Sequence, residues 1–169
     1  MTEAKRVVQD LQRMQSNKAA MTAFKNCLSP ARAHKAWPYI AQLKWCDIQD
    51  DRMRTIVQHI AAFFAKHPNH VSGTCIGDSL RLMASRRTQQ NAIEVNERYL
   101  KRILSSRDYQ SLCPRLAFVL HMIKGTDVPV DYERLLSDIV FWNEDTRIRW
   151  ASAYYSNKGD EDVSDKSIG

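Results

Sequence analysis

Helical periodicity is the feature that most constrains how this chain folds. Between residues 53 and 64, apolar side chains recur on one face of an α-helix, as Ile56, Val57, Ile60, Phe63 and Phe64 illustrate. A stripe of this width predicts a long amphipathic helix with one buried face. The chain has only five Gly and five Pro among 169 residues, too few for the many tight turns of a sandwich or barrel. The sequence therefore predicts an all-α fold of about eight or nine helices.

Capping residues predict where several helices begin. Asn17, Asp108 and one of the pair Asp50 and Asp51 precede apolar-periodic segments, where their side chains can accept unpaired N–H groups. Ser29-Pro30 is predicted to open a further helix, because proline at the first helical position loses no hydrogen bond. In the last helix, the side chains expected to face inward are Ile148, Ala151, Tyr154 and Tyr155.

A polar segment near residues 67–74 is the predicted boundary between two parts of the chain. Proline, asparagine, serine and glycine interrupt the helical period there. We therefore expect two packed helical bundles, residues 1–70 and 71–157, followed by a disordered polar tail at residues 158–169. Two histidines of the boundary segment, His67 and His70, are expected to be solvated.

Basic charge is unevenly distributed along the chain. The 25 Lys and Arg against 19 Asp and Glu give a net charge of +6. Residues 1–70 carry +6, residues 71–120 carry +4, and residues 121–157 and 158–169 each carry −2. A basic body of this kind is compatible with a polyanionic partner, although a merely soluble basic protein has a similar composition. With a polar N-terminus and no apolar run of 18 residues, a cytoplasmic protein with reduced thiols and no membrane contact is expected.

No segment carries the pattern of a catalytic site. Gly73-x-x-x-Gly77 lacks the Lys-Ser/Thr pair that a phosphate-binding loop requires. Cys75 is expected to be a small buried thiol rather than a nucleophile, and the four cysteines match no metal or haem spacing. We therefore expect a protein that is not an enzyme and that uses no cofactor, no metal and no small-molecule substrate.

Lysine and arginine cluster in three places: on the helix predicted after Asn17, around the start of the long helix, and between residues 81 and 115. In the third and richest cluster, Arg98 and Arg102 are four residues apart and share one helix face, where they can follow a phosphate backbone. A solvated helix face is the alternative interpretation. The predicted nucleic-acid contacts are Lys25, Arg52, Arg54, Arg98, Arg102, Arg107 and Arg115.

Several aromatic residues lie near these basic clusters. Tyr99, Tyr109, Trp37 and Trp45 can stack on bases. Packing in the core is the more general use of large aromatic side chains. We expect it for Trp37, Trp142, Trp150, Tyr154 and Tyr155.

From residue 71 onward the order of motifs is similar to that of one known family. Val130-Asp131-Tyr132 is followed by paired leucines at 135 and 136, by Asp138 and by Trp142. Earlier in the chain stand Gly77-x-x-Leu80 and Asn96-Glu97-Arg98, and the last helix carries Arg147, Arg149, Trp150 and Tyr154-Tyr155. With these residues the chain resembles the CasB-type small subunit of the type I-E CRISPR Cascade complex, over roughly residues 20–157.

The resemblance implies an all-α fold in two bundles and no enzymatic activity. It implies that the partners are other Cascade subunits, a second copy of the chain, guide RNA, and target and non-target DNA. Lys25, Arg52, Arg98 and Arg115 are approximate matches to basic positions of the family, whereas Arg54, Arg102 and Arg107 come from helical spacing alone. The chain departs from the family at Asp78 and Tyr99, where basic residues are expected.

Three functions are compatible with these observations. The first is a nucleic-acid-clamping subunit that holds the displaced strand of an R-loop against a basic surface, because backbone contacts can tip a nearly balanced strand exchange. The second is a purely structural spacer whose basic surface meets partner proteins. The third is a stand-alone helical DNA-binding protein, although no helix-turn-helix with a short glycine turn is evident.

Overall fold

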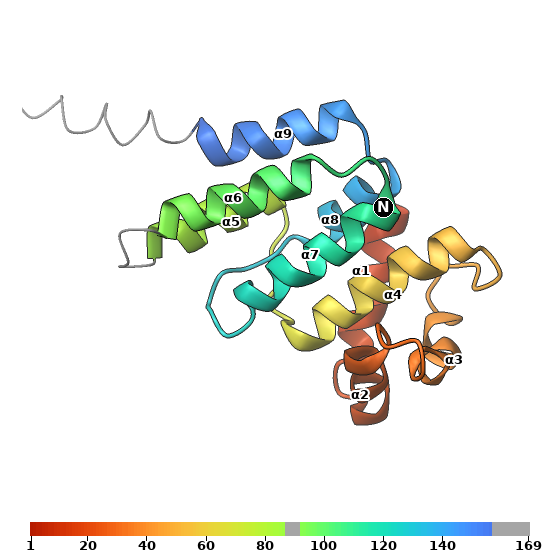
Figure 1. The fold of residues 1–169 in the computed structure, drawn as a ribbon. Coiled ribbons are helices and arrows are strands. Elements are labelled where there is room, and N and C mark those ends of the chain that lie inside the picture. Colours follow the sequence, from red (N-terminus) through yellow and green to blue (C-terminus); the bar gives the residue numbers. More distant parts are fainter. Residues whose placement is uncertain (87–91, 157–169) are drawn as a thin grey trace, which may run out of the picture.

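The computed structural model describes residues 1–86 and 92–156, where every regular element is helical apart from one isolated β-bridge between His70 and Val130 (Figure 1). The all-α prediction is confirmed, and the predicted disordered tail at residues 158–169 lies outside the described residues. A 3-10 helix, η1 (Ala33–Lys35), precedes α3. The α-helices are α1 (Glu3–Met14), α2 (Lys18–Asn26), α3 (Trp37–Ile40), α4 (Asp51–Lys66), α5 (Ile76–Arg86), α6 (Ala92–Leu104), α7 (Tyr109–Ile123), α8 (Tyr132–Val140) and α9 (Glu144–Tyr155).

The long helix α4 provides the central surface of the core. Its predicted stripe is confirmed, since Ile56, Val57, Ile60, Phe63 and Phe64 are all buried. α4 packs against α2, α3, α7 and α8, so it joins elements from both halves of the chain. The helix that carries the apolar stripe predicted from the sequence thus packs against several other helices.

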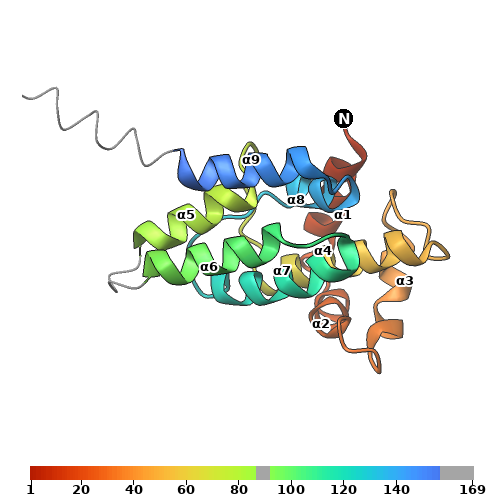
Figure 2. The same cartoon turned by 45° about the horizontal axis from the view of Figure 1, so that its top comes forward.

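The helices of the C-terminal half divide between two places. α5, α6 and α9 pack against one another and run side by side, with α2 and α3 at the opposite end of the molecule (Figures 1 and 2). α8 instead packs against α1, α4 and α7. One hydrophobic cluster includes residues from both halves, and the division into bundles 1–70 and 71–157 stays a prediction.

Hydrogen bonds fix the segment that joins α4 to α5. Tyr132 is fully buried at the start of α8, and its hydroxyl donates to the carbonyl oxygen of His67 at 2.6 Å. The Asp131 carboxylate accepts from the backbone N–H groups of Gly73 and Thr74, at 2.7 and 3.2 Å. These contacts satisfy backbone groups that the end of α4 and the loop would otherwise leave unpaired.

The prediction that His67 and His70 are solvated is wrong. His67 is buried, and its Nε2 lies 2.7 Å from the carbonyl oxygen of Val128, to which it donates. His70 is half-buried, and its Nδ1 accepts from the backbone N–H of Tyr132 at 3.2 Å. Both rings connect the loop after α4 to the segment between α7 and α8, and that contact spans about 60 residues of sequence.

Most of the predicted helix starts are confirmed, and one is wrong. The side chains of Asn17, Asp50 and Asp108 cap α2, α4 and α7. Ser29-Pro30 does not open an α-helix: the carbonyl oxygen of Ser29 accepts from the N–H groups of Arg32 and Ala33, and the chain continues into η1. The inward prediction for Ile148 is also wrong, because its side chain is 59% exposed whereas the neighbouring Trp150 and Tyr154 are buried.

Gly77 sets the distance between α5 and α9. A Cβ atom at this position would overlap the carbonyl oxygen of Trp150 and would lie 3.2 Å from the Cβ of Ala153. The close approach is therefore possible only without a side chain, although glycine inside a helix costs about 1 kcal/mol relative to alanine. Trp150 in turn is fully buried and donates its Nε1 hydrogen to Asp138 of α8 at 2.6 Å.

We predict that Gly77→Ala destabilises the fold by about 1–3 kcal/mol, the usual cost of overpacking a tight contact, despite the gain in helix propensity. Urea unfolding followed by circular dichroism at 222 nm measures the change. Ser85→Ala, at an exposed position of the same helix, is the matched control and is expected to change the free energy of unfolding little. A Gly77→Ala protein as stable as the wild type would show that α5 and α9 can separate without cost.

Candidate nucleic-acid interface

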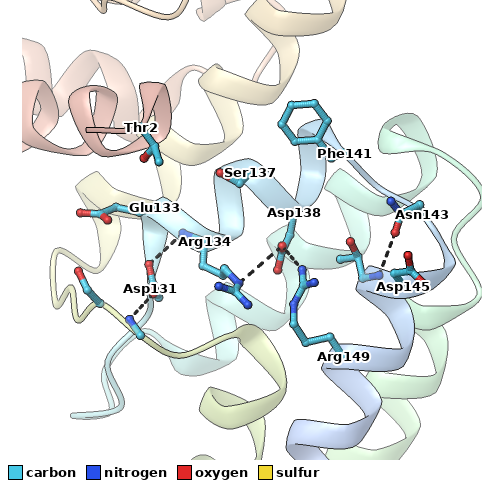
Figure 3. A pocket seen from close by; sticks show the side chains of 13 residues that line it. Thr2, Asp131, Glu133, Arg134, Ser137, Asp138, Phe141, Asn143, Asp145 and Arg149 are labelled. Carbon is cyan, nitrogen blue, oxygen red and sulfur yellow. Dashed lines mark hydrogen bonds and ion pairs between the residues drawn. The ribbon is translucent and has the colours of Figure 1, made fainter.

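The arginines around α8 and α9 are held in internal contacts (Figure 3). Arg149 makes an ion pair and hydrogen bond with Asp138, and Arg134 Nε lies 4.0 Å from the same carboxylate. Arg147 donates to the carbonyl oxygen of Ser106, and its guanidinium carbon lies 5.5 Å from the centroid of the Trp142 ring. These cations stabilise the fold and leave little free positive charge on this side of the molecule.

A hollow of about 620 Å³ lies beside these arginines, between the start of α1, the loop before α5, α8 and α9 (Figure 3). Asp131, Glu133, Asp138 and Asp145 contribute four carboxyl groups, against only two arginines. Burial raises the pKa of Asp138, and the hydrogen bond from Trp150 and the charge of Arg149 act in the opposite direction. The hollow is therefore unsuited to a polyanion, despite its size.

Three of the seven predicted contact residues are used inside the fold. Arg52 donates to the carbonyl oxygen of Val140 at the end of α8 and lies over the ring of Tyr109. Arg54 pairs with Asp51, donates to the carbonyl oxygen of Ile48 and lies 5.8 Å from the centroid of the Trp37 ring. Arg115 donates to the carbonyl oxygen of Arg102 at 2.9 Å, and to the Ser105 and Ser106 hydroxyls. Arg115 thus closes the C-terminal end of α6, where the last carbonyl groups have no helical partner.

The other four predicted residues are exposed. Lys25 lies on α2, Arg98 and Arg102 lie one turn apart on α6, and Arg107 lies between α6 and α7. None of the four side chains makes a hydrogen bond or ion pair with another described residue. The adjacent acid does not neutralise this row, since the Glu97 carboxylate lies 3.2 Å from Lys101 Nζ and accepts from the Tyr155 hydroxyl at 3.0 Å.

A second basic group, on α2 and η1, was only partly predicted. A hollow of about 600 Å³ there is lined by Lys18, Arg32 and Lys35 together with Asn26 and Tyr39. No carboxylate lines it, because residues 11–46 contain no Asp or Glu at all. That run contains six Lys and Arg, namely Arg13, Lys18, Lys25, Arg32, Lys35 and Lys44. The acid-free run is the sequence signal that would have identified Arg32 and Lys35.

α7 and α4 connect the two basic groups. α6 and α7 run side by side in Figure 2, and α2 lies below them. A small depression between α7, α4 and the end of α2 is lined by Lys66, His121 and Lys124 together with Leu28. We call the series of exposed and half-buried cations from α6 to η1 the basic strip, and its members are Lys18, Lys25, Arg32, Lys35, Lys66, Arg98, Arg102, Arg107 and Lys124.

The cysteines lack the properties of reactive thiols. Burial raises the pKa of Cys75 to about 11 and the pKa values of Cys27 and Cys113 to about 12. The Cys46 thiol, which is half-buried, has its pKa raised to about 11, chiefly by burial and also by Asp47 and Asp50. In residues 1–86 and 92–156, no three His, Cys, Asp or Glu side chains are placed to hold a metal ion. The same residues include no helix that is long and apolar enough to cross a membrane.

Comparison with known proteins identifies the class of this chain. The family model of the CRISPR-associated protein Cse2 matches residues 11–155. The structure is similar to that of CasB from Thermus thermophilus, with 26% sequence identity, a TM-score of 0.71, and coverage of 92% of this chain and 99% of that one. A second solved structure, of a CRISPR-associated protein of the Cse2 family from Thermus thermophilus, gives the same identity and coverage, with a TM-score of 0.74. Among the sequences of curated proteins there is no match.

The fold and the family match thus define a CRISPR-associated protein. The chain belongs to the Cse2 family, whose members are structural subunits of Cascade. The resemblance inferred from the Val130-Asp131-Tyr132 segment and the Trp150 helix is confirmed. The three residues of the Asn96-Glu97-Arg98 motif have different environments in the structure. Asn96 is fully buried, Glu97 bonds to Tyr155 and Lys101, and Arg98 is exposed.

We predict slow alkylation of the native thiols. At pH 8 a thiol with a pKa of about 11 is about 0.1% thiolate, so the native protein should react with iodoacetamide roughly a hundredfold more slowly than the urea-unfolded chain. The native rate should rise about tenfold per pH unit until the protein unfolds or the pH nears 11. Mass spectrometry of quenched samples locates the label, and fast labelling of Cys75 at neutral pH would identify it as an activated nucleophile.

Proposed function

We propose that this chain is a non-catalytic small subunit of a type I-E Cascade complex that acts in antiviral defence. It holds the displaced non-target strand by its phosphate backbone, and thereby stabilises the R-loop formed by guide RNA and target DNA. Its partners are the other Cascade subunits, a second copy of the chain, and the nucleic acids. The observation that carries this proposal is the basic strip, whose cations have no carboxylate partner among the described residues.

Unpaired and paired cations differ in what they contribute to binding a polyanion. An exposed lysine or arginine that meets a phosphate releases condensed counterions, which is the main source of affinity without base recognition. A guanidinium already bonded inside the fold must first break those contacts. We therefore propose Lys25, Arg98, Arg102 and Arg107 as strand contacts, whereas Arg52, Arg54 and Arg115 hold the elements that present them.

Contacts of this kind suit R-loop formation. The guide–target duplex is about as stable as the DNA duplex it replaces, so modest binding of the released strand shifts the equilibrium. Such binding has to accept any sequence, since the target changes with the guide. A strip of exposed side chains meets this need, because phosphates are the same at every nucleotide.

We predict that Arg98→Glu combined with Arg102→Glu weakens binding of single-stranded DNA at least about tenfold, or ~1.4 kcal/mol, near physiological salt. The slope of log K against log salt should become shallower by about 1.4, since each phosphate contact to a single strand contributes roughly 0.7. Fluorescence anisotropy with the full chain measures both quantities, and R-loop formation by the reconstituted complex should weaken in parallel.

The matched control changes the net charge equally at another place. Lys5→Glu combined with Arg6→Glu reverses two exposed cations on α1, whose N-terminal end borders the acid-rich hollow of Figure 3. Equal loss of binding in both double variants would mean that net charge, not the basic strip, attracts the strand. If Arg98→Glu with Arg102→Glu abolishes assembly in size-exclusion chromatography but leaves DNA binding intact, the protein is a structural spacer.

The α2–η1 end of the strip gives a separate prediction. Lys18→Glu combined with Lys35→Glu should weaken binding of a long single strand, of about 30 nucleotides, more than binding of a short one, of about 8 nucleotides. The reason is that only the longer strand can reach both basic groups. Anisotropy titrations with the two strand lengths measure the difference. An equal loss of affinity for both strands would mean that α2 does not contact the bound strand.

A further inference from the structure

We propose that the hollow between α6 and α7 accepts an unpaired base of a single nucleic-acid strand, with Phe118 as its stacking surface. This inference rests on the proposed function and adds to it a preference for single strands over duplex. It assigns a binding role to a residue that lies within no basic cluster. Phosphate contacts alone would not distinguish strands in this way.

The hollow has the size and lining of a site for one flat ring. It encloses about 210 Å³, below the roughly 300–1,000 Å³ of pockets for drug-sized ligands. Tyr99, Arg102 and Ile103 line it from α6. From α7 it is lined by Pro114, Arg115, Phe118 and Val119. A lining that combines apolar side chains with two arginines suits a nucleotide, whose base is flat and whose phosphate is charged.

Phe118 is exposed in a way that packing does not explain. Its side chain is 54% exposed, while the next residues of α7, Val119 and Leu120, are almost completely buried. Its ring centroid lies 5.3 Å from that of Tyr99, with the planes 35° apart. Rings in direct contact leave no space for a third ring between them, so a base would stack on the exposed part of Phe118, with Tyr99 packed against the same ring.

The charges around the hollow fit a nucleic-acid strand. Arg98 and Arg102 follow one face of α6, and Arg107 continues the row toward α7. Two acids close to the row in sequence are engaged elsewhere: Glu97 with Lys101 and Tyr155, and Asp108 with the Ser111 backbone and hydroxyl in the cap of α7. Glu94 lies one turn before Arg98 on α6, and it forms no ion pair with a described residue. A strand whose phosphates follow the row could turn one base into the hollow. A duplex could not, because its bases are paired and stacked within the helix.

The test compares Phe118→Ala with Phe118→Tyr in the full chain. We expect Phe118→Ala to weaken binding of a 12-nucleotide thymidine strand about 5- to 150-fold, the range for loss of one base–aromatic stack. Phe118→Tyr, which keeps an aromatic face, should bind like the wild type. The salt slope should be unchanged in both variants, because no phosphate contact is removed. Because Phe118 is exposed, its replacement should leave the fold intact, which circular dichroism checks.

A second measurement uses abasic DNA. If a base occupies the hollow, a strand of abasic nucleotides should bind the wild type more weakly than the thymidine strand does, and Phe118→Ala should remove that difference.

Wild-type affinity of Phe118→Ala for the thymidine strand would overturn the inference. The proposed function would still stand if Arg98→Glu with Arg102→Glu weakens binding. If the wild type binds no single strand, the proposed function and this inference both fail. If Phe118→Ala impairs assembly with partner subunits but not strand binding, the hollow is a protein contact and the inference is wrong.

Discussion

The burial of Trp150 between α5 and α8 is the contact on which the positions of the other C-terminal helices depend. On one side, Gly77 lets the backbone of α5 come so close to Trp150 that no side chain fits. On the other side, the Trp150 Nε1 hydrogen bonds to Asp138, which also receives Arg149. A buried carboxylate is costly unless it is paired and hydrogen-bonded, and Trp150 and Arg149 together meet that requirement. α9 is thereby fixed against α5 and α8, and α6 is placed by its packing against α5, α7 and α9. Arg98 and Arg102 lie on α6, so the packing around Trp150 contributes to the position of the helix that carries them.

The distribution of carboxylates then decides which cations remain available. Around α8 and α9 the acids outnumber the arginines, and each arginine finds an acid or a carbonyl oxygen. Across residues 11–46 there is no acid, and Arg13 at the start of this run pairs with Asp10. The lysines of this run and Arg32 form no ion pair with a described residue, and Arg32 donates to the amide oxygen of Asn26. The same residue types thus stabilise the fold at one end and stay exposed at the other. For a protein that must bind and release a strand, exposed lysines are suitable. Each phosphate contact of a lysine adds a small, salt-dependent contribution to the binding free energy.

The sequence predicts those parts of this structure that depend on neighbours along the chain. The stripe on α4 and the caps Asn17, Asp50 and Asp108 follow from local periodicity and local hydrogen bonding, and all are confirmed. Ser29-Pro30 was misread because the same local pattern is satisfied by a single turn, after which the chain enters η1. Contacts between distant residues escaped prediction. Nothing in the spacing shows that Arg115 bonds to the end of the preceding helix or that Arg52 reaches the end of α8, 88 residues away. Whether an arginine is available to a ligand is a property of the fold, so a count of basic residues in sequence overestimates the site.

Some cations are bonded inside the fold and others are exposed. This difference helps to explain how a helical subunit can bind a strand without recognising its base sequence. A rigid groove of bonded arginines would favour one spacing of phosphates. The basic strip instead combines long side chains from α2, η1, α4, α6 and the segments that flank α7, and these can adjust to the path of a flexible strand. Such adjustment costs side-chain entropy at each contact, so affinity has to come from several weak contacts rather than from a few strong ones. An aromatic surface beside Arg102 of the strip complements this arrangement, because stacking is nearly independent of salt and of base identity. Phosphate contacts and stacking would then respond differently to ionic strength. A strand held by both would stay bound at salt concentrations that remove a duplex held by phosphates alone.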